Sequence, residues 1–260
     1  MNPADNITNN ALDDAAELVR NAKRIVVLTG AGVSTSSGIP DFRSEGTGLW
    51  SRDEPLEAAS LTTFRTAPEK FFHWFRPLAG QIFHAQPNPA HNALAELENT
   101  DKTITIITQN IDGLHQKAGS RNVLELHGTI RTLSCTQCYQ QHDSHPLLPA
   151  YIQHGTLPHC ENCSRLLKPD VILFGEQLPQ SAWYEAQRQA RQTHLMLVAG
   201  SSLEVLPVAG LPIQAIDHGA HLIVINNTPT YINPRADVVL TGDVATVIPT
   251  IIKRVTHGRS

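Results

Sequence analysis

Residues 24–44 read RIVVLTGAGVSTSSGIPDFRS, and this stretch decides the fold class. Residues 24–28 are a short apolar run rich in β-branched side chains, which predicts a buried strand. The strand leads into a turn that contains Gly30 and Gly32. Such a turn lets backbone N–H groups approach a pyrophosphate, helped by the N-terminus of a following helix. Because the glycine spacing is GxGxxxxxG, the standard dinucleotide fingerprint is not met, and the two glycines alone are equally typical of a tight strand–helix turn.

The residues after the turn favour a nucleotide site over a plain connection. Residues 40–43 read PDFR, so an acid (Asp41), an aromatic face (Phe42) and a guanidinium (Arg43) follow the predicted phosphate loop. These three side chains offer a carboxylate, a stacking surface and a cation beside a phosphate group. The stretch as a whole therefore indicates a ligand site at the end of the first strand.

The rest of the chain alternates apolar runs with helical segments. Residues 11–22 and 90–98 predict amphipathic helices. The further predicted strands cover residues 102–108, 194–199, 221–225 and 236–240. Short β-rich runs separated by helices predict an α/β fold with a Rossmann-like, doubly wound parallel sheet that is covered on both faces.

Two segments interrupt this alternation. Residues 44–89 are rich in Phe, Trp and Pro with helical patches, and residues 131–168 are polar and contain all four cysteines. We interpret them as excursions from one sheet that together form a smaller domain. The predicted large domain is discontinuous and comprises residues 1–44, 90–130 and 168–260. The small domain then has a helical part, residues 45–89, and a zinc-binding part, residues 131–167.

Two polar motifs follow predicted strands. Residues 108–115 read TQNIDGLH, and Gln109, Asn110 and Asp112 offer amide and carboxylate partners at a strand's carboxyl end, where open α/β sheets bind ligands. The same residues are also typical of a capped helix start. His127 follows the run VLE at residues 123–125. Its ordinary pKa lies near physiological pH, so it is a candidate general base, although it is one of 13 histidines.

The cysteines form two CxxC pairs separated by 21 residues. Four thiolates can close a tetrahedral zinc site, and in a reducing compartment this pattern favours a metal over disulfides. A structural zinc ion is therefore predicted, since no open position for catalysis is implied. Four intervening histidines could each replace a cysteine. The predicted ligands are Cys135, Cys138, Cys160 and Cys163, and the alternative histidines are His142, His145, His154 and His159.

The composition and charge of the chain limit the kinds of molecule that it can be expected to bind. The chain has 260 residues and a formal net charge of −4, which argues against a nucleic-acid-binding protein and mildly favours a basic peptide as substrate. The longest apolar runs, residues 195–198 and 222–225, are too short to cross a bilayer. The N-terminal residues are polar and lack the basic and apolar regions of a secretory leader, so we expect a cytoplasmic protein.

Taken together, these motifs closely resemble the sirtuin family, over residues 23–243. GAGVSTSSGIPDFRS, TQNIDGLHQKAG and LHG occur in the family's order. The paired CxxC units, KPDVILFGE at residues 168–176, GSSLEVLP at residues 200–207 and Ile225–Asn226 follow in that order too. The resemblance implies an NAD-dependent protein-lysine deacetylase of bacterial type, which transfers the acyl group to ADP-ribose and releases nicotinamide and O-acetyl-ADP-ribose. NAD would be a co-substrate and one zinc ion would be structural.

The resemblance also implies roles for individual residues. His127 would be the general base on the ribose hydroxyls, and Asn110 and Asp112 would orient the ribose and the nicotinamide amide. Phe42 would cover the reactive carbon, and Arg43 would hold the pyrophosphate together with the backbone of the glycine turn. The full set of implied NAD-binding residues is Gly30, Ala31, Gly32, Ser34, Asp41, Phe42, Arg43, Gln109, Asn110, Ile111, Asp112, Gly200, Ser201, Ser202, Asn226, Asp243 and Val244.

By the same resemblance, an acyl-lysine peptide would bind as an added strand between residues 171–176 and 203–207. The implied peptide-binding residues are Val171, Leu173, Phe174, Gly175, Glu176, Leu203, Glu204 and Val205. Sirtuins that prefer succinyl or malonyl groups carry a Tyr and, three residues later, an Arg. Phe75 and Leu78 occupy these places here, which favours acetyl and other apolar acyl groups, unless a shifted alignment brings Arg76 into the acyl site. The enzyme would act as a monomer, with no membrane or nucleic-acid partner.

Three other functions are weighed against this one. Mono-ADP-ribosyl transfer would use the same ribose electrophile. A dehydrogenase is disfavoured by the glycine spacing, which does not meet the dinucleotide fingerprint. A non-catalytic module that binds NAD or zinc is disfavoured because His127 and Asn110 are both present.

Overall fold

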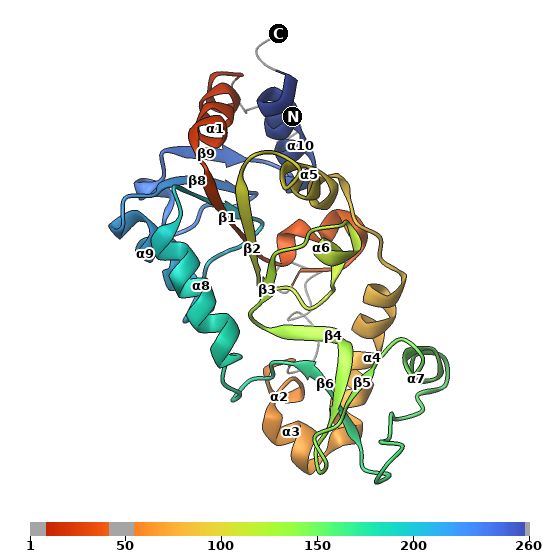
Figure 1. Ribbon diagram of the computed structural model, residues 1–260. Coiled ribbons are helices and arrows are strands. Elements are labelled where there is room, and N and C mark those ends of the chain that lie inside the picture. Colours follow the sequence, from red (N-terminus) through yellow and green to blue (C-terminus); the bar gives the residue numbers. More distant parts are fainter. Residues whose placement is uncertain (1–8, 42–54, 258–260) are drawn as a thin grey trace.

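The computed structural model describes residues 9–41 and 55–257. Its main feature is a parallel sheet of six strands in the order β3-β2-β1-β7-β8-β9 (Figure 1). The strands are β1 (Arg24–Thr29), β2 (Thr103–Thr108), β3 (Val123–Glu125), β7 (Leu195–Ala199), β8 (His221–Asn226) and β9 (Val238–Thr241). This confirms the predicted Rossmann-like, doubly wound sheet, and the strands predicted from apolar runs are present with small shifts at their ends.

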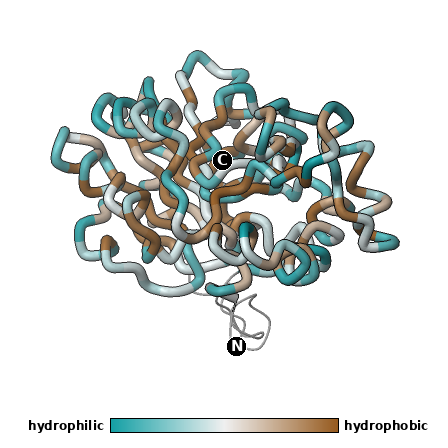
Figure 2. The backbone as a smooth tube through the Cα atoms, turned by 90° about the horizontal axis from the view of Figure 1, so that it is seen from below, coloured by the Kyte–Doolittle hydropathy of each residue, from teal (hydrophilic) through white to brown (hydrophobic). Residues whose placement is uncertain are grey.

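Helices cover both faces of this sheet because alternate strand residues point to opposite sides. Ile25 and Val27 share one core with α1 (Asn9–Asn21), α5 (Pro89–Leu97) and α10 (Val244–His257). The opposite core contains Val26 and Leu28 with α8 (Gln180–Gln192) and α9 (Leu211–Asp217). Figure 2 shows the hydrophobic segments concentrated in the interior, with hydrophilic turns around them. The double burial explains why the strands read as continuous apolar runs.

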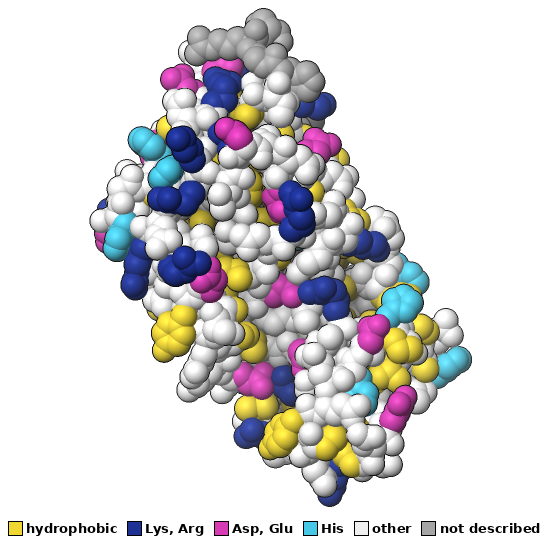
Figure 3. All heavy atoms as spheres, viewed as in Figure 1, with side chains coloured by type: hydrophobic (Ala, Val, Ile, Leu, Met, Phe, Trp, Pro, Cys, Tyr) yellow, Lys and Arg dark blue, Asp and Glu magenta, His cyan; other side chains and the backbone are white. Residues whose placement is uncertain are grey.

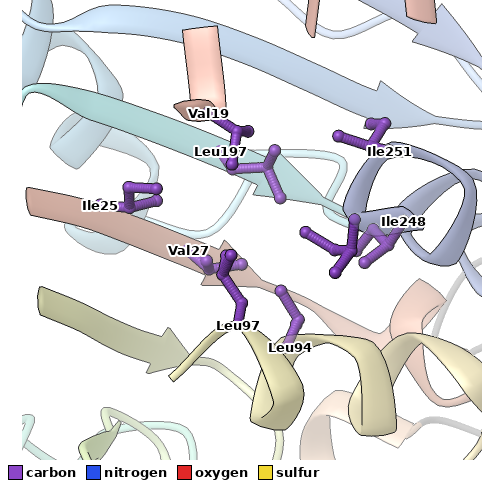
Figure 4. Close-up of a pocket in the computed structure, with 9 residues that line it drawn as sticks. Val19, Ile25, Val27, Leu94, Leu97, Leu197, Ile248 and Ile251 are labelled. Atoms are coloured by element: carbon purple, nitrogen blue, oxygen red, sulfur yellow. The ribbon is translucent and has the colours of Figure 1, made fainter. Parts of the chain in front are cut away.

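A small pocket lies in the first of these cores, between the sheet and α1, α5 and α10 (Figure 4). Its lining is wholly aliphatic, so it offers no polar group to orient a substrate and belongs to the packing of the core. The lining residues are Val19, Ile25, Val27, Leu94, Leu97, Leu197, Ile248, Ile251 and Ile252. No helix in the described part of the chain combines the length and the hydrophobicity needed to cross a membrane.

Two insertions form the smaller unit at the lower end of Figure 1. The first contributes the helices α2 (Pro55–Ala58), α3 (Leu61–Thr66) and α4 (Pro68–His84). The second contributes α7 (Leu148–His154) and an antiparallel sheet in the order β5-β4-β6, formed by β5 (Gln141–Asp143), β4 (Gly128–Cys135) and β6 (Leu167–Val171). Phe71 and Phe72 of α4 share one core with Tyr151 of α7 and Val171 of β6, so the two insertions pack together as predicted.

The three-stranded sheet itself was not predicted. Its strands lack continuous apolar runs, and β4 buries only Ile130, Leu133 and Cys135 of its eight residues. An antiparallel sheet with one face exposed to solvent mixes polar and apolar residues, whereas the prediction of strands relied on continuous apolar runs. Pairing partners that are remote in sequence, such as Ser134 and Lys168, supply the order that the local sequence does not show.

Candidate active site

The site lies at the carboxyl ends of the parallel strands, where the order of the sheet reverses between β1 and β7. Open α/β sheets bind ligands at this switch point, outside the carboxyl ends of the strands. Here the turn after β1 meets the turn after β7, because the Gly30 N–H donates to Ala199 O at 3.2 Å and the Gly32 N–H donates to Gly200 O at 2.9 Å. Gly200 has φ +61°, and a Cβ there would lie 2.4 Å from the Val33 nitrogen. Glycine is therefore required for this close approach of two backbones.

The turn after β1 differs from the strand–helix turn considered above. Residues up to Asp41 form two single 3-10 turns, Ala31–Val33 and Thr35–Ser37, so no α-helix N-terminus follows the glycines in this part of the chain. Four consecutive hydroxyl residues, 34–37, and Gly38, which has φ +85°, disfavour a helix here. The turn thus presents its own backbone N–H groups and hydroxyls rather than a helix end. Phe42 and Arg43 lie outside the described residues.

Beside the turn, the structure brings together five of the predicted polar residues. The Ser34 hydroxyl donates to Asp112 Oδ2 at 2.7 Å, and the Asn110 amide donates to Ser34 Oγ at 3.0 Å. Gln109 Nε2 donates to Ser201 Oγ at 2.9 Å and so joins the loops after β2 and β7. These contacts fix amide and carboxylate groups from three separate strand ends in one cluster.

Asp112 satisfies both interpretations of its motif. Its second oxygen, Oδ1, accepts the Leu114 N–H at 2.9 Å at the start of α6 (Leu114–Lys117). The residue therefore caps a short helix with one oxygen and binds Ser34 with the other. A capped helix start and a polar site are here the same structure.

His127 follows β3 and is half-buried. Its Nδ1 lies 3.1 Å from Gln109 O, and because a carbonyl oxygen only accepts, Nδ1 carries the proton and Nε2 keeps a lone pair. Burial lowers the pKa of His127 from its ordinary value, and the hydrogen bond to Gln109 O offsets part of this effect. The imidazole is therefore neutral at neutral pH and suited to accept a proton on Nε2. Its own carbonyl accepts the Ile172 N–H at 2.8 Å, which ties the base to the predicted peptide segment.

The four cysteine sulfurs lie within 4.8 Å of one another. The Cys135–Cys163 and Cys138–Cys160 separations are 3.4 and 3.6 Å, far longer than a disulfide bond. Tetrahedral zinc with Zn–S bonds of about 2.3 Å requires S···S distances of about 3.8 Å, so the set fits zinc. Among the described residues, none of the four intervening histidines joins this cluster. The N–H of Cys138 donates to Cys135 Sγ and lowers the pKa of Cys135 to about 6, which favours the thiolate that binds a metal.

The first predicted peptide segment is only partly available to a ligand. Phe174 uses both backbone groups on residues before α3, because its N–H donates to Ala59 O and its carbonyl accepts the Leu61 N–H, each at 3.0 Å. The Glu176 carboxylate accepts the Leu173 N–H at 2.8 Å and pairs with Lys168 Nζ at 3.0 Å, so it stabilises its own loop. Gly175 makes no backbone hydrogen bond within the described chain, and a side chain built there would meet nothing within 4 Å.

The second predicted peptide segment is not a regular strand. Leu203 has φ +56°, is buried, and donates its N–H to Ser201 Oγ at 3.2 Å. Leu206 at the other end is exposed over 78% of its surface. Residues 205–207 form a bend and a turn, so the segment offers at most a short extended stretch.

The remaining predicted NAD-binding residues divide into two groups. Asp243 accepts the Ala245 N–H at 3.0 Å at the start of α10 and lies 3.3 Å from the Ser36 hydroxyl, so it joins the glycine turn. Asn226 ends β8 and donates to Thr228 O at 2.9 Å. Val244, in contrast, has its side chain in the aliphatic core, where it can contribute only backbone to a site. Ile111 likewise packs against the small-unit core.

Arg76 is held against the end of α7. Phe75 and Leu78 of α4 are buried in the core of the small unit. The Arg76 guanidinium instead donates to Ile152 O and Gln153 O, both at 2.8 Å, at the end of α7. Adjacent helical residues project about 100° apart, so the buried face of α4 excludes Arg76.

Several residues that organise the site were not predicted. Asn88 is buried and donates to Val33 O at 2.8 Å and to Ser37 Oγ at 3.0 Å, which anchors the glycine turn to α5. Its signal was present in the sequence, since Asn followed by Pro89 is typical of a helix start. Thr29 and Thr108 lie beneath the cluster and carried no local signal.

The fold and the site define an α/β nucleotide-binding protein that carries a four-cysteine zinc module. The chain belongs to the Sir2 family, whose family model matches residues 30–207. NAD-dependent protein deacylase 2 of Archaeoglobus fulgidus is 44% identical over 247 residues, covering 95% of this chain and 96% of that protein. The NAD-dependent protein deacetylase of Chromobacterium violaceum is 50% identical over 230 residues, covering 86% and 89%. A solved Sir2–p53 peptide–NAD+ structure is 34% identical with a TM-score of 0.83, covering 93% of this chain and 97% of that chain.

Proposed function

We propose that this protein removes acetyl groups from protein lysines with consumption of NAD, releasing nicotinamide and O-acetyl-ADP-ribose. The observation that carries the proposal is a neutral His127 whose Nε2 lone pair is free, beside the cluster of Ser34, Asn110 and Asp112 at the switch point of the sheet. Membership of the Sir2 family and the deacylase and deacetylase relatives support the same reaction.

In this proposal NAD lies across the carboxyl ends of β1, β2, β7 and β8. The backbone of residues 30–32 and Ser34 face the pyrophosphate side, and Asn226 with Asp243 faces the adenosine side. The contact between Ser36 and Asp243 supports this arrangement, because it brings the last strand's loop against the glycine turn. Bound NAD supplies an electrophilic ribose carbon once nicotinamide leaves, and the acyl oxygen of the substrate attacks that carbon.

His127 has the role of general base. Its Nδ1–H bond to Gln109 O holds the ring, so Nε2 is presented to a ribose hydroxyl and takes its proton. The lowered pKa keeps the base in its neutral form at neutral pH. Asn110 and Asp112, fixed by Ser34, orient the polar groups of the ribose and the nicotinamide amide.

The acyl-lysine peptide is expected to bind through backbone hydrogen bonds near Gly175. Phe174 is already paired with residues 59–61, so the next peptide unit is the one with free backbone groups. A Sir2 structure that contains a p53 peptide supports a peptide as ligand. On the face shown in Figure 3, basic and acidic side chains are interspersed without a large patch of one sign, which suits a small peptide better than a nucleic-acid backbone.

The acyl group is expected to be acetyl or another apolar acyl. Phe75 and Leu78 are buried and apolar, and the guanidinium of Arg76 is held by α7. A succinyl or malonyl carboxylate would therefore find no guanidinium from this part of α4. One zinc ion held by the four cysteines would be structural. The clustered thiols suit the reducing cytoplasm, where we expect the protein to work as a monomer.

The division of the chain into domains also remains a proposal. The large domain would comprise residues 1–44, 90–130 and 168–260, and the small domain residues 45–89 and 131–167. The core shared by α4, α7 and β6 supports the pairing of the two inserted segments.

The test is incubation of the purified protein with an acetyl-lysine peptide, with and without NAD, while peptide mass and free nicotinamide are measured. The variant is His127→Ala. The matched control is His218→Ala, because His218 Nδ1 also bonds a backbone carbonyl, that of Gln214, but lies exposed on α9. Coupled loss of acetyl and release of nicotinamide, absent only in His127→Ala, supports the proposal. Mass gained by a protein acceptor would indicate ADP-ribosyl transfer instead, and no nicotinamide release with any acyl peptide would refute an enzymatic role.

A further inference from the structure

Two histidines that the proposed reaction does not use are buried side by side beneath the active-site cluster. His91 lies in the first turn of α5 and His115 lies in α6, and their side chains are 0% and 1% exposed. Their ring centroids are 4.8 Å apart with planes inclined by 57°. Burying two imidazoles removes both from water, so a ring nitrogen without a hydrogen-bond partner lowers the stability of the fold.

The hydrogen bonds around the rings fix where each proton lies. His91 Nδ1 accepts the Asn88 N–H at 3.3 Å, so the proton of His91 is on Nε2. His115 Nε2 lies 3.0 Å from Thr29 Oγ1, whose hydroxyl donates to Thr108 Oγ1 at 2.8 Å. Since that hydroxyl has a single hydrogen, His115 Nε2 is the donor and its Nδ1 is a bare acceptor.

Two nitrogens of the adjoining rings then have complementary character. His91 Nε2, a donor, and His115 Nδ1, an acceptor, both lack a hydrogen-bond partner among the described residues. Burial lowers the pKa of both histidines, that of His115 to about 3, so both rings are neutral at neutral pH. The pair therefore acts as a neutral polar contact and not as a buried charge.

A continuous series of hydrogen bonds runs from His115, against which the His91 ring packs, to the active site. His115 donates to Thr29, and Thr29 donates to Thr108. Thr108 Oγ1 also accepts the backbone N–H of Asn110 at 3.0 Å. Thr29 and Thr108 are the last residues of β1 and β2, and they are 0% and 2% exposed. The series thus holds the backbone of Asn110 relative to two strand ends.

The same pair also lies between the anchors of the two active-site loops. The Asn88 side chain holds the glycine turn through Val33 O and Ser37 Oγ, while the Asn88 N–H donates to His91. On the other side, Asp112 caps the short helix that carries His115. Movement of either ring would therefore be transmitted to the glycine turn, to Asp112, or to Asn110.

We propose that His91 and His115 are positioning residues, which act through Thr29 and Thr108 to hold Asn110 in the geometry that the reaction needs. This inference rests on the proposed function. The simpler alternative is that both rings only fill space in a tightly packed region. The two ideas differ in one respect, because a space-filling role does not depend on the hydroxyl of Thr29.

The test compares Thr29→Val with Thr29→Ser. Valine keeps the shape but removes the hydroxyl between His115 and Thr108, whereas serine keeps the hydroxyl. The matched control is Thr105→Val, because Thr105 is equally buried in β2 and accepts a hydrogen bond from Asn122 at 2.7 Å, but no bond connects it to Asn110. We expect Thr29→Val to lower kcat by about tenfold to a hundredfold, with the KM of the peptide changed by less than about twofold. Thr29→Ser and Thr105→Val should retain kcat within about threefold at comparable stability.

A second variant and a spectroscopic measurement keep the inference open to refutation. His115→Phe should lower kcat like Thr29→Val, and the double variant should be no worse than the more damaging single variant, since both break one series. In the folded protein, ¹⁵N spectra of the imidazoles at neutral pH should show both rings neutral with the proton on Nε2. The inference is refuted if Thr29→Val has the kcat of Thr105→Val, if the two effects are additive, or if either ring carries its proton on Nδ1. A wild-type protein that releases no nicotinamide would instead refute the proposed function, while the spectra would still report on the pair.

Discussion

The anchor formed by Asn88 allows the cost of loosening the glycine turn to be worked out from its contacts. The side chain is 5% exposed and makes three hydrogen bonds. Its Oδ1 accepts the Ala90 N–H at 3.0 Å, which caps α5, and its Nδ2 donates to Val33 O and Ser37 Oγ. Asn88→Ala removes the cap, which costs about 1 kcal/mol, and leaves the buried Val33 carbonyl without its partner, which costs about 1–3 kcal/mol.

The expected loss for Asn88→Ala is therefore about 2–4 kcal/mol in the free energy of unfolding. For a chain of this size that corresponds to a fall in Tm of about 4–16 °C. Asn88→Ser restores the cap but not the Val33 contact, so it should recover about 1 kcal/mol relative to alanine. Urea unfolding followed by fluorescence measures these differences, and steady-state kinetics measures the KM of NAD.

Steady-state kinetics distinguishes an effect on the glycine turn from a general loss of stability. Both Asn88 variants should raise the KM of NAD, because the glycine turn loses its anchor in each. Asn122→Ala is the control, since Asn122 also donates to a backbone carbonyl, that of Ile104, but far from the glycine turn. The reasoning fails if Asn88→Ala destabilises by less than about 0.5 kcal/mol, or if Asn122→Ala raises the KM of NAD by the same factor.

Three further predictions concern the base, the metal and the acyl group. Burial lowers the pKa of His127 below its ordinary value of 6.5. We therefore expect kcat/KM to stay level as pH falls from 8 to 6.5 and to decline only below 6.5. A decline centred above pH 6.5 would contradict the assignment of His127 as the general base. Removing zinc with a chelator should release one metal equivalent, unfold the β4–β6 module and abolish activity. Added zinc should restore the fold and the activity. Full activity in a zinc-free, folded protein would show that the cysteines need no metal. Arg76→Met should lower the free energy of unfolding by about 1–3 kcal/mol, because two hydrogen bonds to α7 are lost. The ratio of acetyl to succinyl removal should stay unchanged. If the wild-type protein removes succinyl groups and this variant does not, Arg76 lies in the acyl site.

Sequence reasoning was accurate for the large sheet because its signals are local. A strand buried on both faces must be apolar throughout, so residues 24–28 and 221–225 could be identified without knowing their neighbours. The cysteine pairs were equally informative, since each CxxC turn already places two sulfurs together. Gln109, Asn110 and Asp112 could be singled out because they directly follow a predicted strand, at the edge where open α/β sheets bind ligands.

The smaller sheet and the hydrogen bonds that connect the site could not be predicted from such local signals. The strands of the β5-β4-β6 sheet lack continuous apolar runs, and the pairing of β4 with β6 joins residues far apart in the chain, such as Ser134 and Lys168. Val244 stays a predicted NAD-binding residue, but only the structure shows that the first turn of α10 directs its side chain into the aliphatic core and leaves its backbone for a ligand. The orientation of Arg76 depended on α7, which lies about 75 residues further along the chain.

The amino-acid sequence by itself determined the class of fold and the four clustered cysteines, and it singled out His127 as the proposed base, because each of these depends on residue types at short spacing. Tertiary structure alone decided that Gly200 must accommodate the turn after β1, that Asn88 holds that turn, and that two buried histidines connect to Asn110. These features depend on contacts between strand ends and helix starts that are far apart in the chain. Such contacts exist only once the sheet has brought the carboxyl ends of its strands to one edge.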